Sequence, residues 1–146
     1  MRKTFLSLAL VVVSFLGILD TSYLTYEKVT GQFPRCSVSF KCEKVLTSSW
    51  SHIGPIPLSV LGMVFYLVFF CVSSVHFLVP KEKLEHFLLL QSTIGVGVSL
   101  CMIGIMGFIL QAWCLFCLFS ATTSILLFMI SSSVFIQGRK KYEPSI

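Results

Sequence analysis

The sequence predicts an all-α integral membrane protein: a bundle of four transmembrane helices with a long extracytoplasmic loop between the first and second. Of its 146 residues, 55% are hydrophobic and only 12% are charged, and the mean hydropathy is +0.91. A soluble domain carries about 25% charged residues, and a disordered chain combines low hydrophobicity with high charge. Both classes are therefore excluded. At roughly 20 residues per span, four spans and their connections fill residues 1–146 as a single membrane domain.

The first span is expected over residues 5–23, an apolar run that follows Arg2 and Lys3. A basic start followed by an apolar run is also typical of a signal peptide. The polar residues that follow Leu19 contain no clear cleavage pattern, so we expect a retained span.

A polar loop is expected over residues 26–56, and it contains Cys36 and Cys42. Its glycines and prolines favour turns. The stretch 43–51 has neither, and Val45, Leu46 and Trp50 could share one face of a short interfacial helix.

The second span is expected over residues 57–79, opened by Pro57 at the first helical position, and a charged turn is expected over 81–86. Residues 87–138 contain no Asp, Glu, Lys or Arg. As one helix they would be about 75 Å long, so the chain must fold back. Gln111–Trp113 is the expected break, and it gives a third span over 87–110 and a fourth over 114–136.

The basic residues predict the orientation. Seven of the eleven fall on the side that holds both termini and the 81–86 turn, and four fall in the long loop. The positive-inside rule then makes both termini cytoplasmic in the inner (plasma) membrane. The long loop and the turn between the third and fourth spans both face the extracytoplasmic side.

Cys114 and Cys117 form a C-x-x-C at the outer start of the fourth span. Residues three apart share a helix face, and a helix N-terminus lowers a thiol pKa. This is the pattern of a redox-active dithiol. Two packed structural thiols are the alternative, and a metal site would need more ligands than the neighbouring sequence offers, so we expect no metal.

Cys36 and Cys42 form the second pair, on the same predicted side. Alone it could be a static disulfide of an oxidising compartment, in which case the protein would be a stapled membrane scaffold. Two dithiols within reach can pass electrons by thiol–disulfide exchange. The electron donor would be an extracytoplasmic protein dithiol, and a lipid-soluble quinone suits the acceptor. Cys71 and Cys101, near the middle of spans two and three, are expected to be structural.

The role of Asp20 is open. Asp20 near the end of the first span could handle a proton, form a structural hydrogen bond or be hydrated at the interface. A small cation- or proton-coupled transporter built on Asp20 is the rival function, but no internal repeat supports it.

Gly95 and Ser99 form a small-xxx-small pair suited to close helix packing. The basic residues lack the aromatic interleaving of a nucleic-acid surface.

Taken together, the motifs resemble the vitamin K epoxide reductase family in its short bacterial form without a fused thioredoxin-like domain. The resemblance covers most of the chain. It is carried by Asp20-x-x-Tyr23-Leu-Thr-Tyr26, Cys36-x5-Cys42-Glu43-x-Val45-Leu46-x-Ser48, Ile56-Pro57-Leu58-Ser59-x-x-Gly62 and Cys114-x-x-Cys117-x-x-Ser120-Ala121.

The resemblance implies a quinone-dependent thiol–disulfide oxidoreductase that reoxidises a thioredoxin-fold partner and so supports disulfide formation. It implies that Cys36 exchanges with the partner, Cys42 with Cys114, and that Cys117 reacts with the quinone. Ser48 matches the loop serine placed to hydrogen-bond the quinone carbonyl or to stabilise the reacting state. A surface residue of the interfacial helix is the alternative for Ser48.

The same resemblance bears on the substrate. Leu58 and Ala121 stand where animal members have a quinone-binding asparagine and tyrosine, which favours a respiratory quinone of the ubiquinone or menaquinone type over vitamin K epoxide. A protein running mainly as a quinone or quinone-epoxide reductase is the alternative within the family.

Overall fold

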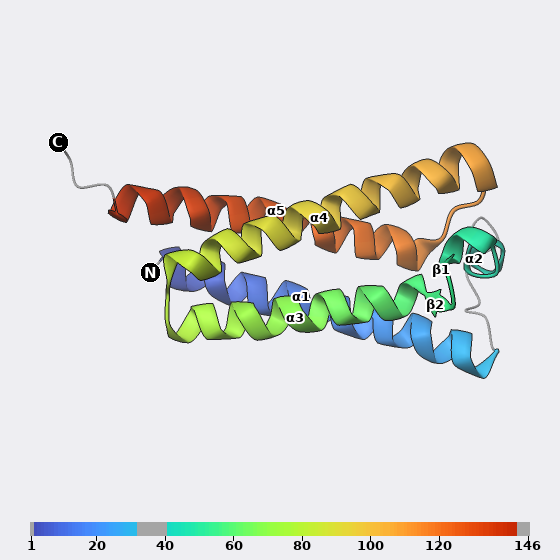
Figure 1. Cartoon of the computed structure of the whole chain (residues 1–146), viewed down its shortest axis with the longest axis horizontal. Coiled ribbons are helices and arrows are strands. Elements are labelled where there is room, and N and C mark those ends of the chain that lie inside the picture. Colours follow the sequence, from blue (N-terminus) through green and yellow to red (C-terminus); the bar gives the residue numbers. More distant parts are fainter. Residues whose placement is uncertain (1, 32–40, 143–146) are drawn as a thin grey trace.

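The computed structural model describes residues 2–31 and 41–142, with side chains for residues 4–31 and 41–139. Four long helices run along its length (Figure 1), namely α1 (Arg2–Thr30), α3 (Leu58–Leu78), α4 (Glu82–Gly104) and α5 (Leu115–Tyr142). A π-helical segment, η2 (Ile105–Leu110), continues α4. The described residues contain four helical spans long and apolar enough to cross a membrane, so the predicted all-α four-span bundle is confirmed.

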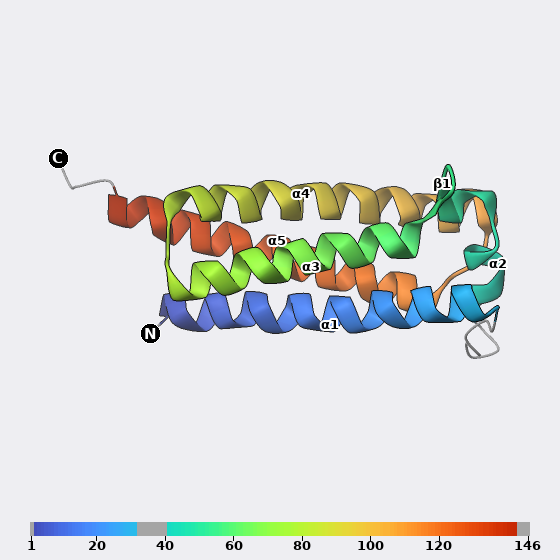
Figure 2. The same ribbon diagram turned by 60° about the horizontal axis from the view of Figure 1, so that its bottom comes forward.

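The short elements gather at one end of the bundle, here called the loop end (Figures 1 and 2). They are α2 (Cys42–Leu46), η1 (Ser49–Ser51), β1 (His52–Ile53) and β2 (Ile56–Pro57). The connection between η2 and α5 lies at the same end, whereas α1 begins and α5 ends at the opposite end. The chain thus brings the 41–57 segment close to the start of α5.

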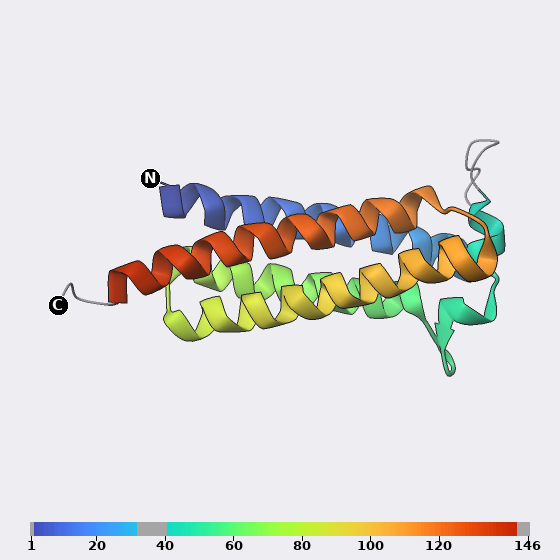
Figure 3. The same cartoon turned by 90° about the horizontal axis from the view of Figure 1, so that it is seen from above.

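Each long helix packs against two others: α1 contacts α3 and α5, and α4 contacts α5 and α3. Figure 3 shows α5 lying between α1 and α4 in the view from above. All four helices contribute to one buried cluster, which consists of Leu10, Tyr66, Phe69, Leu88, Leu127 and Val134. At Gly95 a Cβ atom would lie 2.6 Å from Cζ of Phe65, so this glycine lets α3 and α4 approach closely.

Two of the helices were predicted too short. α1 continues past residue 23 to Thr30, and the loop expected from residue 26 begins only at Gly31. Gly31 has a φ of 68°, a left-handed conformation that favours glycine and ends the helix. α5 likewise continues to Tyr142 instead of ending at 136. Polar residues extend both helices because a helix need not stop where its apolar run stops.

The prediction of a charged turn over residues 81–86 was wrong. α4 begins at Glu82 rather than at residue 87, and only 79–81 connect it to α3. Glu82 and Glu85 lie in the first turn of α4, where the positive end of the helix dipole favours acidic groups. Pro57 also lies one position earlier than predicted, as the N-cap of α3.

The predicted break after the third span is confirmed. Gln111 takes the left-handed conformation with φ 46°, and residues 111–114 are not helical. The backbone N–H of Ala112 donates to the carbonyl of Met106 at 3.2 Å, which closes the end of η2.

The single interfacial helix expected over residues 43–51 is instead two short helices, α2 and η1, separated by Ser48 in an extended conformation. A two-stranded antiparallel hairpin follows, with His52 opposite Pro57. Gly54 turns this hairpin with a φ of 63°. The sequence reading missed the hairpin because its strands are only two residues long.

Candidate functional site

Cys42 and Cys114 lie in one buried cluster at the loop end. Their exposed fractions are 1% and 0%, and Val45, Met106 and Ala112 complete the cluster. The backbone N–H of Lys41 donates to the carbonyl of Trp113 at 3.0 Å. The residues that directly precede the two cysteines are therefore joined, which brings a loop cysteine and the first C-x-x-C cysteine into one environment.

Cys114 directly precedes the first turn of α5. Its carbonyl accepts a hydrogen bond from the N–H of Leu118 at 3.1 Å. A hydrogen bond from the Cys117 side chain lowers the pKa of the Cys114 thiol, against the opposing effect of burial, and the backbone N–H groups of Cys117 and Phe116 lower it further. The site thus combines the helix N-terminus with a neighbouring thiol as donors to one sulfur.

The cysteines differ in redox state and in exposure. Cys42 is disulfide-bonded, whereas Cys114 and Cys117 carry free thiols. Cys36, predicted to exchange with a partner, lies outside the described residues. Cys71 on α3 and Cys101 on α4 are free and exposed, and their structural role stays a prediction.

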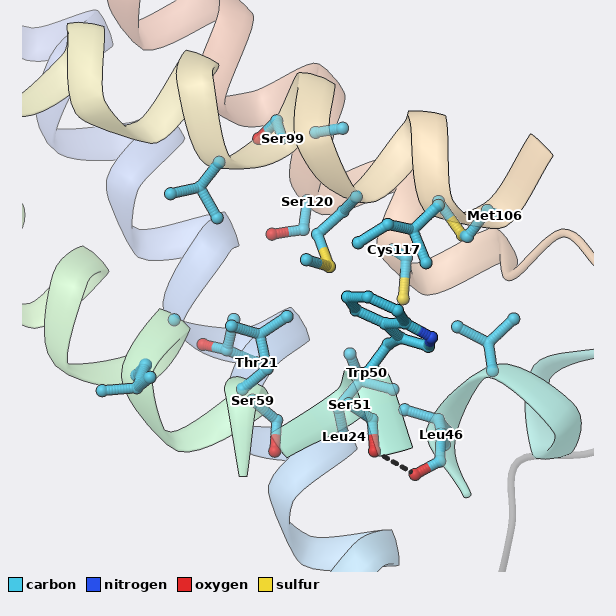
Figure 4. Close-up of a pocket in the computed structure, with 18 of the residues that line it drawn as sticks. Thr21, Leu24, Leu46, Trp50, Ser51, Ser59, Ser99, Met106, Cys117 and Ser120 are labelled. Carbon is cyan, nitrogen blue, oxygen red and sulfur yellow. Dashed lines mark hydrogen bonds between the residues drawn. The ribbon is translucent and has the colours of Figure 1, made fainter. Parts of the chain in front are cut away.

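A cavity of about 320 Å³ opens beside Cys117. Figure 4 shows the Cys117 sulfur pointing into it, towards the indole of Trp50. Cys114 is not among the residues that line the cavity. The lining is mostly apolar and comes from α1, the 45–62 segment, α3, α4, η2 and α5; it includes Leu24, Leu46, Leu58, Phe65, Ile94, Val98, Met102, Met106 and Ala121. Cys117 also packs against the cluster of Cys42 and Cys114, but of the two C-x-x-C members only Cys117 lines the cavity.

Ser48 also lines this cavity. Its hydroxyl donates to the carbonyl of Val45 at 2.7 Å, so its oxygen can accept a further hydrogen bond as it stands and must rotate to donate one. Donation to a ligand carbonyl would break the bond to Val45.

Lys28 and Ser59 are polar cavity residues to which the sequence reading gave no role. The Nζ of Lys28 donates to the carbonyl of Leu46 at 3.2 Å and to Oγ of Ser51 at 3.0 Å, which ties α1 to the loop segment. The hydroxyl of Ser59 is buried and has no hydrogen-bond partner among residues 4–31 and 41–139. Its position in the Pro57-Leu58-Ser59 start of the second span was the available signal, but the sequence could not show that the hydroxyl faces a cavity.

Tyr66 adds a polar group to the cavity wall. Its hydroxyl donates to the carbonyl of Ser120 at 2.8 Å and lies 2.8 Å from Oγ1 of Thr123 and 3.0 Å from Oγ of Ser124. The ring packs on Gly17 of α1. Tyr66 therefore joins α3 to α1 and α5 at the cavity wall.

Asp20 lies inside the bundle and not at a hydrated surface. Its exposed fraction is 8%, and its Oδ2 has no hydrogen-bond partner in the part of the chain that the structure describes. Burying an unpaired carboxylate costs free energy, so the interfacial alternative for Asp20 was wrong.

An apolar cavity of this size suits a quinone head group, because small-molecule sites are mostly apolar pockets of about 300 Å³ or more with few polar groups. Within residues 2–31 and 41–142, no three His, Cys, Asp or Glu side chains gather closely enough to hold a metal ion. The side-chain donors that line the cavity are hydroxyls, the indole N–H of Trp50 and the ammonium group of Lys28.

Comparison with known proteins links this site to a family. Residues 8–132, which include all four cysteines of the two pairs, match the Vitamin K epoxide reductase family. The thiol-disulfide oxidoreductase LTO1 of Arabidopsis thaliana is 34% identical over 122 residues, a match that covers 78% of this chain and 32% of that protein. The chain thus spans about a third of the length of this curated relative.

Proposed function

Because this chain belongs to the vitamin K epoxide reductase family, we propose that it is a quinone-dependent membrane thiol–disulfide oxidoreductase that reoxidises an extracytoplasmic thioredoxin-fold protein. One observation carries the proposal. Cys42 and Cys114 share a buried cluster, while Cys117, one helical turn further on, lines the apolar cavity. The name of the Arabidopsis relative supports thiol–disulfide chemistry.

Electrons enter at the loop pair. A reduced partner thiolate attacks Cys36 and a second partner thiol completes the exchange, so that the partner becomes oxidised and Cys36 and Cys42 become thiols. The Cys42 thiolate then attacks the sulfur of Cys114 in a Cys114–Cys117 disulfide. This forms a Cys42–Cys114 mixed disulfide and releases Cys117 as the leaving thiolate beside the cavity.

The exchange ends when Cys36 attacks Cys42 and releases Cys114. A thiol with a low pKa leaves faster, and the hydrogen bonds from Cys117 and Phe116 lower the pKa of Cys114. Cys114 and Cys117 then become a disulfide again as two electrons pass to the quinone, which takes up two protons. The net reaction converts a partner dithiol and a quinone into a partner disulfide and a quinol.

The quinone occupies the cavity with its ring against Cys117 in this proposal. The fit rests on the cavity volume of about 320 Å³ and on its apolar lining. Leu58 and Ala121, which both line it, offer no hydrogen bond. Because they stand where animal members of the family have a quinone-binding asparagine and tyrosine, we infer a respiratory quinone of the ubiquinone or menaquinone type and not vitamin K epoxide as the substrate.

The loop end faces the extracytoplasmic side of the inner (plasma) membrane, with both termini in the cytoplasm. The excess of basic residues at the opposite end supports this orientation. A thioredoxin-fold partner would then meet the loop end in an oxidising compartment, where protein disulfides persist.

The direct test uses the purified protein in lipid nanodiscs, a reduced thioredoxin-fold protein and a short-chain ubiquinone analogue. We expect quinone reduction in step with oxidation of the partner, because two electrons pass from one to the other. Cys117→Ala is expected to abolish the reaction, and the change is followed by the ultraviolet absorbance of the quinone.

Cys101→Ala is the matched control, because this thiol is exposed on α4. We expect it to retain the wild-type rate. Turnover that persists in Cys117→Ala would contradict the proposal.

A further inference from the structure

We propose that the ammonium group of Lys28 is an anion-binding subsite of the cavity, which stabilises the negative charge that a quinone acquires when it is reduced beside Cys117. The inference rests on the proposed function and deepens it, because it names the group that meets the charge of the reduced ligand. It predicts that the cavity binds an anionic quinone through Lys28.

Lys28 is the one charged side chain in the described lining of the cavity. The acidic residues Asp20 and Glu27 of the same helix do not line it. Among the described side chains the one ion pair joins His76 to Glu85, so no carboxylate lies within ion-pair distance of Lys28. A cation in mostly apolar surroundings without a counter-charge is costly in free energy. A ligand with negative charge would supply that counter-charge.

Two hydrogen bonds fix the position of the Lys28 ammonium group. Its Nζ donates to the carbonyl of Leu46 at 3.2 Å and to Oγ of Ser51 at 3.0 Å, and both acceptor residues line the cavity. The Ser51 hydroxyl donates in turn to the Leu46 carbonyl at 2.7 Å, the bond drawn as a dashed line in Figure 4. Both acceptors are uncharged, so these bonds orient the ammonium group without cancelling its charge.

Within the described residues, one N–H of Lys28 is left for a ligand. An ammonium group carries three donors, and Leu46 and Ser51 take two of them. Because Lys28 lines the same cavity as Cys117, a quinone held there lies beside a cation whose position is already set. A preoriented donor needs no rearrangement at the moment when charge develops on the ligand.

The redox balance shows when this charge appears. Cys114, with its lowered pKa, starts as a thiolate and Cys117 as a thiol. Their oxidation forms one S–S bond and releases two electrons and one proton. A quinone that takes up these two electrons and this proton becomes a quinol anion, with its negative charge on one oxygen, and a second proton from water completes the quinol. Lys28 lowers the energy of the anion and so favours the step that precedes the second protonation.

A purely structural role is the alternative for Lys28, because its two hydrogen bonds also tie α1 to the loop segment. Loss of that tie would weaken the binding of every ligand in the cavity. A cation instead favours an anionic ligand over a neutral ligand of the same shape. Two quinones that differ in charge alone therefore separate the two roles.

The test measures the binding of two naphthoquinones to the fully oxidised protein in lipid nanodiscs, where no quinone can be reduced. One carries a hydroxyl on its quinone ring and is an anion at neutral pH, and the other is its neutral methyl ether. Quenching of tryptophan fluorescence reports binding, because Trp50 lines the cavity. Lys28→Met should weaken the binding of the anion roughly tenfold and that of the ether by less than about twofold.

Three further variants isolate the charge. Lys28→Arg keeps the positive charge and should retain most of the affinity for the anion. Ser51→Ala removes one bond to Lys28 but leaves the ammonium group, so it should lose less affinity for the anion than Lys28→Met does. Lys83→Met removes an equal charge from an exposed position of α4 at the opposite end of the bundle and should bind both quinones as wild type does.

Turnover gives a second readout. In the quinone-reduction assay with the neutral ether, Lys28→Met should lower the turnover number roughly tenfold and change the KM by less than about twofold. This split is expected because the negative charge is absent from the bound quinone and develops only during its reduction. Lys28→Arg should restore most of the turnover number.

The outcomes distinguish this inference from the proposed function. A wild-type protein that binds neither quinone would overturn the quinone site of the proposed function. If wild type and Lys28→Met bind the anion equally, or if Lys28→Met loses equal affinity for both quinones, the anion subsite is overturned and the proposed function stands. If Lys28→Met does not fold, Lys28→Gln, which keeps N–H donors without the charge, is compared with Lys28→Arg and decides in the same way.

Discussion

Cys114 and Cys117 show that the two members of a C-x-x-C can face different reaction partners. Cys114 lies at the start of α5 in the cluster with Cys42, and Cys117 lines the cavity. The motif spacing could predict that the sulfurs meet. It could not predict which sulfur faces the loop cysteine, because that depends on how η2 and α5 are joined.

The pKa of Cys114 gives a prediction at the residue scale. In the reduced protein, the Cys114 thiolate should persist to lower pH than an ordinary thiolate and be lost as pH falls through the lowered pKa. Cys117→Ala removes the largest cause of this shift, a side-chain hydrogen bond, so the titration should move to higher pH. The measurement is the thiolate ultraviolet absorbance against pH, corrected with Cys114→Ala. Identical titrations with and without Cys117 would show that this hydrogen bond is absent.

Ser59 gives a second prediction at this scale, because it lines the cavity and its buried hydroxyl has no partner among the described side chains. We expect it to donate to a quinone carbonyl, an interaction worth about 1 kcal/mol. Ser59→Ala should raise the KM for the quinone analogue by roughly fivefold with little change in turnover number.

Ser133→Ala is the matched control for this measurement. Its hydroxyl is exposed and bonds to the carbonyl of Met129 within α5. An unchanged KM in Ser59→Ala would exclude Ser59 from quinone binding.

At the scale of elements, close packing of α3 and α4 forms one wall of the cavity. Gly95 receives the ring of Phe65, and Gln91 Nε2 donates to the backbone carbonyl of Phe65 at 2.9 Å. The sequence predicted a small-residue contact at Gly95 and Ser99, but not its partner. Small residues show that a helix approaches a neighbour, and only the three-dimensional arrangement shows which one.

Two glycines of α4 test this packing. Gly95→Ala would place a Cβ atom 2.6 Å from the Phe65 ring, whereas the corresponding atom at Gly97 meets nothing within 4 Å. Overpacking costs about 1–3 kcal/mol, so Gly95→Ala should lower the thermal unfolding midpoint in detergent. Gly97→Ala should leave it unchanged or raise it, because alanine favours helix by about 1 kcal/mol over glycine. Equal midpoints for the two variants would refute the contact.

At the scale of the whole molecule, hydropathy and helix length were enough to predict the four spans and the break at Gln111. They could not predict the helical ends of α1 and α4, because polar residues such as Lys28 and Glu82 continue a helix beyond its apolar run. The cavity was also beyond reach, since its lining comes from elements distant in the sequence. The burial of Asp20 became visible only with packing, because burial is a property of neighbours.

The central claim is that loop and α5 sulfurs meet at one end of a membrane bundle and exchange electrons there. Its most direct test is a Cys36→Ser, Cys117→Ser double variant, which leaves Cys42 and Cys114 as the only relay thiols. After mild oxidation in membranes, mass spectrometry under non-reducing conditions should find a Cys42–Cys114 disulfide in most molecules. If both thiols instead remain free and react separately with a maleimide, the relay does not exist.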